Sequence, residues 1–308
     1  MTNETHMSSV VSLFEVSEDI EWPDVSVGGA PYWTHRTPPL QGLSLHFAVQ
    51  CTDRELGLYL QSLLSPLRVD SPEVHVYSLV SQSDGAVNMF FNDAWIDRLP
   101  DPSTAVDRLL QDLNQKVVEE SPELLLFHAG GLQSGDVGIL LPAPSGSGKS
   151  TLVAALVRDG LGYLSDELMA VTSSGAQLLP YQKPLALKSG SFELLCELKP
   201  VLAPAWAEFA GEQWHVPATQ VGTGSVGQAC TAGLVILPHY IRGGSTSLRR
   251  LHRAETFLSL AVNSVNIDAH GGQGAQLLGD LVEQCECYEL EMSDLNEACR
   301  LVFSLLAN

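Results

Sequence analysis

The sequence has little positive charge. It contains 16 lysine and arginine residues against 36 aspartate and glutamate residues, which gives a formal net charge of −20 at pH 7. A chain this acidic repels the phosphate backbone of DNA or RNA unless its cations gather in one patch. A modest group of arginines, which suits a nucleotide or a loop equally well, lies at positions 242, 249, 250 and 253. We therefore expect no nucleic-acid partner.

Long apolar runs are also missing. No run reaches the roughly 18 residues that a membrane-spanning helix needs. Residues 1–24 are acidic, without the basic start and apolar core of a signal peptide. The cysteines show no C-x-x-C pair and suit reduced thiols; they lie at positions 51, 196, 230, 285, 287 and 299. These absences predict a cytoplasmic protein with no membrane partner and no cysteine-based metal site.

The first part of the chain carries no recognisable motif. Residues 1–38, rich in Ser, Glu and Pro, are predicted to be a weakly structured leader. A helix is expected from about Thr52, because Thr52 and Glu55 have the spacing of a capping box. A hairpin around SQSDG and a helix that begins at Asp101-Pro102-Ser103 follow. Residues 39–118 are therefore predicted to form a small α+β module.

The rest of the chain alternates apolar strands with helices. ELLLFHAGGL and VGILLP, joined by QSGD, are predicted to be adjacent strands, and a helix through Arg158 follows. Further strands are predicted at LGYLS, LMAVT, AQLL, PLALK, AGLVILP and CYELEM. Helices are expected near residues 253–264 and 274–284, and after Ser293-Asp294 at the C-terminus. This alternation predicts an α/β domain.

The stretch LPAPSGSGKST, residues 141–151, lies between a predicted strand and a predicted helix. Glycines let backbone N–H groups converge on an anion, a lysine reaches the outer phosphates of a nucleotide, and a hydroxyl binds Mg²⁺. Ala143 stands where such loops usually have their first glycine, and we expect it to keep a negative φ. The residues predicted to bind the nucleotide are Ser145, Gly146, Ser147, Gly148, Lys149, Ser150 and Thr151.

Two further side chains are candidates for chemistry. Asp166 ends the strand that follows the loop's helix, so its carboxylate is expected at the same sheet edge as the loop, where it suits Mg²⁺ binding or activation of a hydroxyl. Capping of the next element is the alternative role for Asp166. His128 ends the apolar strand that precedes the loop, and a structural or a functional role fits a single histidine there.

The run FHAGGL…VGILLPAPSGSGKSTLVAALVRDGLGYLSDE resembles HPr kinase/phosphorylase, and especially the HPr-kinase-related proteins of bacteria. The resemblance is strong over about residues 124–170 and continues weakly through KPLALKSGSFELL, LVILPHY and YELEMSDLNEACRLVFSLL. It implies an α/β fold in which a P-loop core with a mixed sheet, similar to that of phosphoenolpyruvate carboxykinase, follows the smaller N-terminal α+β module. Residues 119–308 would form this nucleotide-binding kinase domain.

The resemblance also implies ATP-dependent phosphorylation of a serine-type hydroxyl, with ATP and Mg²⁺ bound. By position, Lys149 and the loop amides would hold the β-phosphate, and Ser150 would bind Mg²⁺. Asp166 matches the base that takes the acceptor's proton, with His128 as its electrostatic partner. Glu167 stands where the family has a second, metal-binding aspartate. A homo-oligomer is the assembly that the resemblance implies.

The acceptor is left open among a protein, a peptide and a small molecule. Glu167 replaces the family's second aspartate, and the family's downstream glutamate and arginine signatures are missing, so neither HPr as the substrate nor phosphorylase activity is predicted. Two other functions compete with a serine-directed kinase. One is a regulatory or scaffold protein that binds ATP without phosphoryl transfer. The other is a small-metabolite kinase, although such chains usually begin near the loop.

Overall fold

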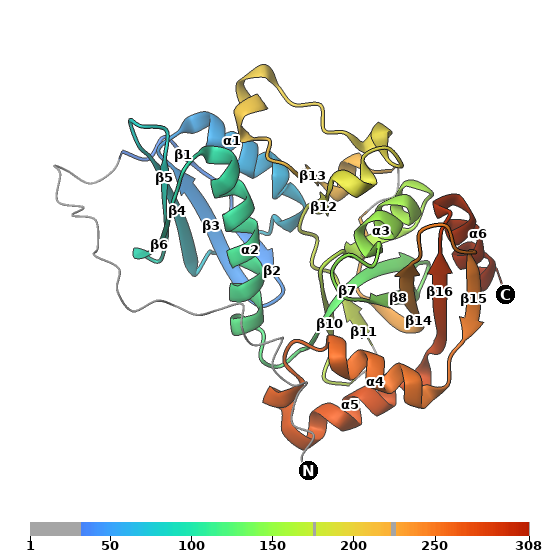
Figure 1. Cartoon of the computed structure of the whole chain (residues 1–308). Coiled ribbons are helices and arrows are strands. Elements are labelled where there is room, and N and C mark those ends of the chain that lie inside the picture. The colour runs from blue at the N-terminus through green and yellow to red at the C-terminus, as the bar shows by residue number, and fades with distance from the viewer. Residues whose placement is uncertain (1–31, 175–176, 223–225, 308) are drawn as a thin grey trace, which may run out of the picture. The chain divides into compact units, whose positions relative to one another are not determined.

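Figure 1 shows the chain as a computed structural model, which describes residues 32–174, 177–222 and 226–307. Residues 33–308 belong to one compact unit. In the described residues the fold is mixed α/β, and its larger sheets contain parallel and antiparallel strand pairs. Residues 1–31 of the predicted leader lie outside the described residues. The boundaries at 38 and 118 remain predictions.

The first sheet in the described residues has six strands, in the order β1-β3-β4-β5-β6, with β2 beside β3. A crossover through the first helix makes β3 and β4 parallel, and β4, β5 and β6 continue as an antiparallel meander. The predicted hairpin is its β4–β5 pair. The elements are β1 (His35–Arg36), β2 (Leu40–Gly42), β3 (Leu45–Cys51), α1 (Arg54–Leu63), β4 (His75–Ser81), β5 (Val87–Phe91), β6 (Ala94–Leu99) and α2 (Pro102–Glu120).

The N-terminal cap of α1 is Asp53, so the prediction of a capping box at Thr52 was wrong. Asp53 Oδ1 accepts from the backbone N–H groups of Glu55 and Leu56, at 2.8 and 3.1 Å. The Thr52 hydroxyl accepts instead from the Ser81 N–H at 2.9 Å, which keeps Thr52 attached to the end of β4. The nearer carboxylate therefore provides the cap.

Helix α2 begins as predicted, with Asp101 as its cap and Pro102 in the first turn. Its buried stripe packs on the first sheet and recurs at helical spacing; it includes Val106, Leu109, Leu113 and Val117. The same core contains Leu126 and Leu168, which lie on two strands of the second sheet. Helix α2 therefore lies where the two sheets share one core.

The second sheet in the described residues has eight strands, in the order β11-β10-β7-β8-β14-β16-β15, with β9 beside β7. A separate two-stranded antiparallel sheet is formed by β12 (Leu185–Leu187) and β13 (Trp214–Val216). The other elements are β7 (Leu125–Ser134), β8 (Val137–Pro142), α3 (Lys149–Arg158), β9 (Gly162–Ser165), β10 (Leu168–Val171), β11 (Gln177–Leu179), β14 (Cys230–Tyr240), β15 (Ser247–Arg250), α4 (Arg253–Asn263), α5 (Gly271–Gln284), β16 (Glu286–Met292) and α6 (Leu295–Leu306). The 3-10 helices are η1 (Ser65–Leu67), η2 (Ser189–Ser191), η3 (Cys196–Leu198), η4 (Pro204–Phe209), η5 (Ala218–Gln220) and η6 (Ile267–His270).

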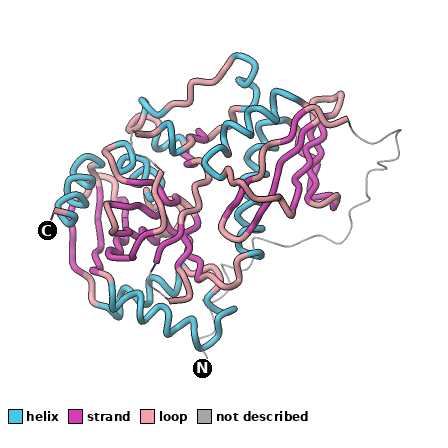
Figure 2. The backbone as a smooth tube through the Cα atoms, turned by 180° about the vertical axis from the view of Figure 1, so that it is seen from behind, coloured by secondary structure: helices cyan, strands magenta, loops and turns pink. Residues whose placement is uncertain are grey.

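Helices cover both faces of the second sheet. Helices α3 and α6 pack on one face, and α4 and α5 pack on the other (Figures 1 and 2). Strands β8, β14 and β16 are parallel neighbours, so their carboxyl ends meet at one edge of the sheet. That edge carries the segments that follow Pro142, Tyr240 and Met292. Ligands of open α/β sheets commonly bind at such an edge.

Each helix of the described residues is too short or too polar to span a bilayer.

Replacing Asp53 by alanine should lower the free energy of unfolding by about 1 kcal/mol, because two amides of α1 lose their acceptor. Urea denaturation followed by circular dichroism measures this change. The matched control is Asp70→Ala at an exposed position, where a change within about 0.5 kcal/mol is expected. Equal effects of the two substitutions would contradict the cap assignment.

Candidate functional site

The glycine-rich loop, residues 143–151, connects β8 to α3 as the sequence predicts. Gly146 and Gly148 have φ angles of +84° and +85°, a region that glycine enters without steric cost. Ala143 is buried and has a negative φ, which confirms that expectation. Helix α3 has no side-chain cap, so its first N–H groups remain free for another acceptor. This geometry suits an anion.

Lys149 is the cation of the loop, and it is buried at the start of α3. Its Nζ donates to the carbonyl of Ala143 at 3.2 Å. Burial lowers the Lys149 pKa to about 8, although Asp166 and Glu167 nearby act to raise it. A phosphate oxygen in place of the neutral carbonyl would accept a stronger, charge-assisted hydrogen bond.

The hydroxyls of the loop differ in their partners. Thr151 Oγ1 shares a hydrogen bond of 2.6 Å with Ser191 Oγ, which ties α3 to η2. Ser147 Oγ is buried and has no partner among the described residues. The Ser150 side chain lines the cavity described below and bonds to no other described side chain. Ser150 and Ser145, which also lines the cavity without a hydrogen bond to another described side chain, are therefore the hydroxyls open to a ligand.

The carboxyl ends of β14 and β16 hold the loop in place. The Tyr240 N–H donates to the Ser147 carbonyl at 3.1 Å. A Cβ on Gly148 would lie 2.7 Å from the flexible end of Met292 at Cε, so a larger residue at 148 would displace that side chain and would be strained at a φ of +85°.

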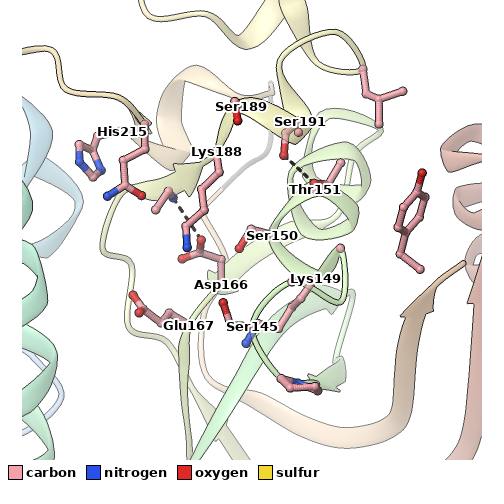
Figure 3. Close-up of a pocket in the computed structure, with 18 of the residues that line it drawn as sticks. Ser145, Lys149, Ser150, Thr151, Asp166, Glu167, Lys188, Ser189, Ser191 and His215 are labelled. Atoms are coloured by element: carbon pink, nitrogen blue, oxygen red, sulfur yellow. Dashed lines mark hydrogen bonds between the residues drawn. The ribbon is translucent and has the colours of Figure 1, made fainter. Parts of the chain in front are cut away.

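Asp166 lies at the corner between β9 and β10 and is 2% exposed. It accepts from the Tyr163 hydroxyl at 3.0 Å and from the Ala186 N–H at 3.2 Å. Burial raises its pKa above the ordinary range, while Lys183 acts against this rise. Asp166 caps no helix, since β10 follows it. It lines the same cavity as Ser150, and Figure 3 shows both side chains entering that cavity.

Glu167, the second acid, is bound by two donors. Its Oε2 accepts from Asn114 Nδ2 at 2.8 Å and from Lys183 Nζ at 2.5 Å. Partial burial acts to raise the Glu167 pKa, but Lys183 and Asn114 bring it down to about 2. One carboxylate oxygen is thus already shared by two donors. The metal-binding role of Glu167 remains a prediction.

His128 lies on β7 opposite Leu168 of β10, and it lines the cavity. Burial lowers its pKa to about 4; Lys149 acts in the same direction and Glu167 acts against it. The ring is therefore neutral at physiological pH. Its partnership with Asp166 remains a prediction, in which a neutral imidazole would act through hydrogen bonding rather than charge.

These residues surround a cavity of about 1310 Å³. The glycine-rich loop and the start of α3 form one wall, and Asp166 and Glu167 lie beside it (Figure 3). His128 also lines the cavity. Other walls come from residues 240–242 and 292–296 at the sheet edge, from residues 183–194, and from α2 together with β13. The cavity therefore joins the predicted nucleotide-binding loop to the N-terminal part of the described chain.

Several residues of the cavity were not singled out by the sequence. Lys183 pairs with Glu167, and His215 of β13 pairs with Asp107 of α2 at 2.5 Å. Lys188 lines the cavity, and its side chain forms no ion pair or hydrogen bond with another described residue. The sequence held one usable signal: in the strand motif PLALK, alternation places Lys188 on the same side as Ala186.

The chain was compared with known proteins. No family model matches it, and no curated protein matches it. Among solved structures, the HPr(Ser) kinase/phosphatase from Coxiella burnetii is similar to it, at 14% sequence identity and a TM-score of 0.31. That match covers 59% of this chain and 94% of the other. Similarity at this level does not establish a family or an activity.

Asp166→Asn should leave the melting temperature at pH 8 equal to or above that of the wild type. A carboxyl whose pKa is raised by folding holds its proton more tightly in the folded state, so its contribution to stability falls as the pH rises above the unfolded pKa. Asparagine carries no charge and avoids this cost. Thermal melts at pH 5 and pH 8 measure the effect, and the gain should be larger at pH 8.

Asp112→Asn is the matched control. Asp112 is also buried, but it accepts from Tyr77 and is paired with Arg108, so this variant should melt at a lower temperature than the wild type. If the Asp166 variant is destabilised at pH 8 as strongly as the Asp112 variant, the buried charge of Asp166 has been misjudged.

Proposed function

We propose that the protein is an ATP-dependent kinase that transfers the γ-phosphate of ATP to a serine-type hydroxyl. The observation that carries this proposal is that the buried carboxylate of Asp166 lines the same cavity as Lys149 and Ser150 of the glycine-rich loop. The resemblance of residues 124–170 to HPr-kinase-related proteins supports the same reaction. Phosphoryl transfer depends mainly on positioning and charge neutralisation, and the cavity supplies residues for both.

The roles follow from position in the cavity. The free N–H groups at the start of α3 and the Lys149 ammonium would bind the outer phosphates of ATP. Lys188, whose ammonium has no partner among the described residues, would add a second positive charge. Tyr163 and Ala186 fix the orientation of the Asp166 carboxylate through their hydrogen bonds.

In the transfer, the acceptor's hydroxyl oxygen forms a bond to the γ-phosphorus, and the bond from that phosphorus to the β–γ bridging oxygen breaks. The hydroxyl proton goes to Asp166, and ADP leaves with the electron pair of the bridging oxygen. The raised pKa of Asp166 makes its carboxylate a stronger base than an exposed aspartate, which favours proton transfer near neutral pH.

Mg²⁺ is the implied metal, and the residues fit it through few ligands. In the described ranges, no three His, Cys, Asp or Glu side chains converge on a possible metal site. Nucleotide-bound Mg²⁺ uses one or two protein ligands, with phosphate oxygens and waters completing its shell, so the open hydroxyl of Ser150 suits it. When bound, the ion would neutralise charge on the phosphates.

A second function is favoured by the state of Glu167. Its carboxylate is paired with Lys183 and Asn114, which withdraws one of the two acids from catalysis or metal binding. A protein that binds ATP as a regulator or scaffold, without phosphoryl transfer, fits this arrangement. The two functions differ in whether ADP release depends on a hydroxyl acceptor.

Asp166→Asn should lower acceptor-dependent ADP release by about 10²- to 10⁴-fold, the usual contribution of a general base. ATP binding should be retained, because Lys149 and the loop are unchanged. A coupled ADP assay and titration with a fluorescent ATP analogue measure the two quantities. The control is Asp280→Asn on the exposed face of α5, and a wild-type rate in the Asp166 variant would refute its role as base.

ATP affinity should fall about tenfold between pH 7 and pH 9, in proportion to the protonated fraction of a lysine with a pKa near 8. The sign follows from the ammonium form of Lys149 being the one that binds phosphate. Fluorescence titrations across this pH range test it. Lys149→Met should bind weakly with a flat profile, whereas an equal fall in that variant would assign the titration to another group.

A further inference from the structure

The α2–β13 wall of the cavity has no role in the phosphate chemistry described above. It consists of Thr104, Asp107, Arg108, Gln111, Gln213 and His215. The cavity, at about 1310 Å³, exceeds the roughly 300–1,000 Å³ of a typical site for one small molecule. It therefore has room for a second ligand beside a nucleotide.

We infer that the α2–β13 wall binds the phosphoryl acceptor, and that this acceptor is a small, electrically neutral polyol. The inference rests on the proposed kinase function and names the substrate class of the same cavity. The polyol's hydroxyl oxygen would form the bond to the γ-phosphorus, its proton would pass to Asp166, and ADP would leave.

The wall lies next to the proposed base. His215 is the direct register partner of Ala186 in the β12–β13 sheet, and Cα atoms of such partners lie about 4.5–5.5 Å apart. The N–H of the same Ala186 donates to Asp166 at 3.2 Å. A molecule bound against His215 is therefore one strand away from the residue that would accept its proton.

The Asp107–His215 pair gives the wall a fixed acceptor of hydrogen bonds. His215 is 6% exposed, its Nε2 lies 2.5 Å from Asp107 Oδ1, and its Nδ1 is buried with no partner among the described residues. Because Nδ1 is shielded from solvent, the polar group that this pair presents to a ligand is the Asp107 carboxylate. Asp107 is partly exposed, so its second oxygen can accept from a ligand hydroxyl.

The charges of the wall exclude an anionic acceptor. Arg108 is already paired with Asp112 at 3.2 Å and with Asp97 at 3.6 Å, and His215 is paired with Asp107. A carboxylate or phosphate on the acceptor would find the Arg108 guanidinium already paired and would face the Asp107 carboxylate. An anionic acceptor therefore gains little attraction here and meets repulsion.

The remaining side chains match a polyol. Gln111 and Gln213 bond to no other described side chain, and each amide can both donate to and accept from a hydroxyl. Leu194, 53% exposed, also lines the cavity with Leu99 and Leu110 and offers apolar surface to C–H groups. Two amides open to a ligand, one carboxylate and an apolar patch together suit a neutral molecule with several hydroxyls.

The experiment measures ADP release from ATP by the full chain with a defined set of acceptors. The neutral polyols are glycerol, D-ribose, D-glucose and myo-inositol. D-glucose 6-phosphate represents anionic acceptors, and the blocked peptide acetyl-Ala-Ala-Ser-Ala-Ala-amide represents serine in a protein. Phosphorus NMR identifies the monoester product. At least one polyol should be phosphorylated, with kcat/KM at least about tenfold above those of the sugar phosphate and the peptide.

Variants of the wall locate the site. Asp107→Ala should raise the KM for the polyol about tenfold or more, while the affinity for a fluorescent ATP analogue stays unchanged and shows that the variant is folded. His215→Leu should act in the same way, and His215→Gln, which can still donate to Asp107, should restore much of the affinity. The matched control is Glu120→Gln, because Glu120 ends the same helix, α2, and pairs with His75 of β4 outside the cavity.

The outcomes distinguish a failure of the polyol site from a failure of the kinase function. Phosphorylation of the peptide without any polyol would support the kinase function and overturn the polyol site. ATP binding without turnover of any acceptor would overturn both. A polyol KM that is unaffected by Asp107→Ala would place the acceptor elsewhere in the cavity.

Discussion

The hydrogen bond from the Ala186 amide to the Asp166 carboxylate joins the two parts of the chain that form the cavity. Asp166 lies between β9 and β10 of the second sheet, close to the glycine-rich loop, whereas Ala186 belongs to the separate β12–β13 sheet. A buried carboxylate needs such donors, because burial without them carries a large cost. The need of the Asp166 carboxylate for hydrogen-bond donors thus fixes the β12–β13 sheet beside the loop. That sheet in turn places His215 against α2.

A second contact connects the N-terminal part of the described chain to the same place. Glu167 is held by Lys183 and by Asn114 of α2, and Tyr181 donates to Asn114 at 3.2 Å. This ion pair adds little net stability, because the buried Lys183 ammonium loses its water. Their contribution here is geometric: they give α2 one defined position against the acid pair. A cavity wall built from distant parts of the chain needs such a constraint.

Local sequence patterns predicted the elements around the loop well. The strands on either side of QSGD, the loop and α3 follow from apolar runs and glycine positions that need no distant partner. The cap of α1 was misplaced by one residue, because Thr52 and Asp53 both suit a cap and the contact with Ser81 decided between them. Asp107 and His215 could not be paired from the sequence, since 108 positions separate them and either residue alone is ordinary. The same holds for Lys183, whose partner depends on how the chain returns to Glu167.

The hydrogen bond from the Lys149 ammonium to the Ala143 carbonyl has a consequence for the entropy of ligand binding. The glycines of the loop have positive φ angles, and the lysine ammonium is directed at a carbonyl of the same loop. An arriving phosphate would exchange one oxygen for another on the same ammonium, with no refolding of the backbone. Binding to such a preorganised loop loses little conformational entropy. Ala143 at the loop's entrance, with a negative φ, restricts the backbone there more than a glycine would.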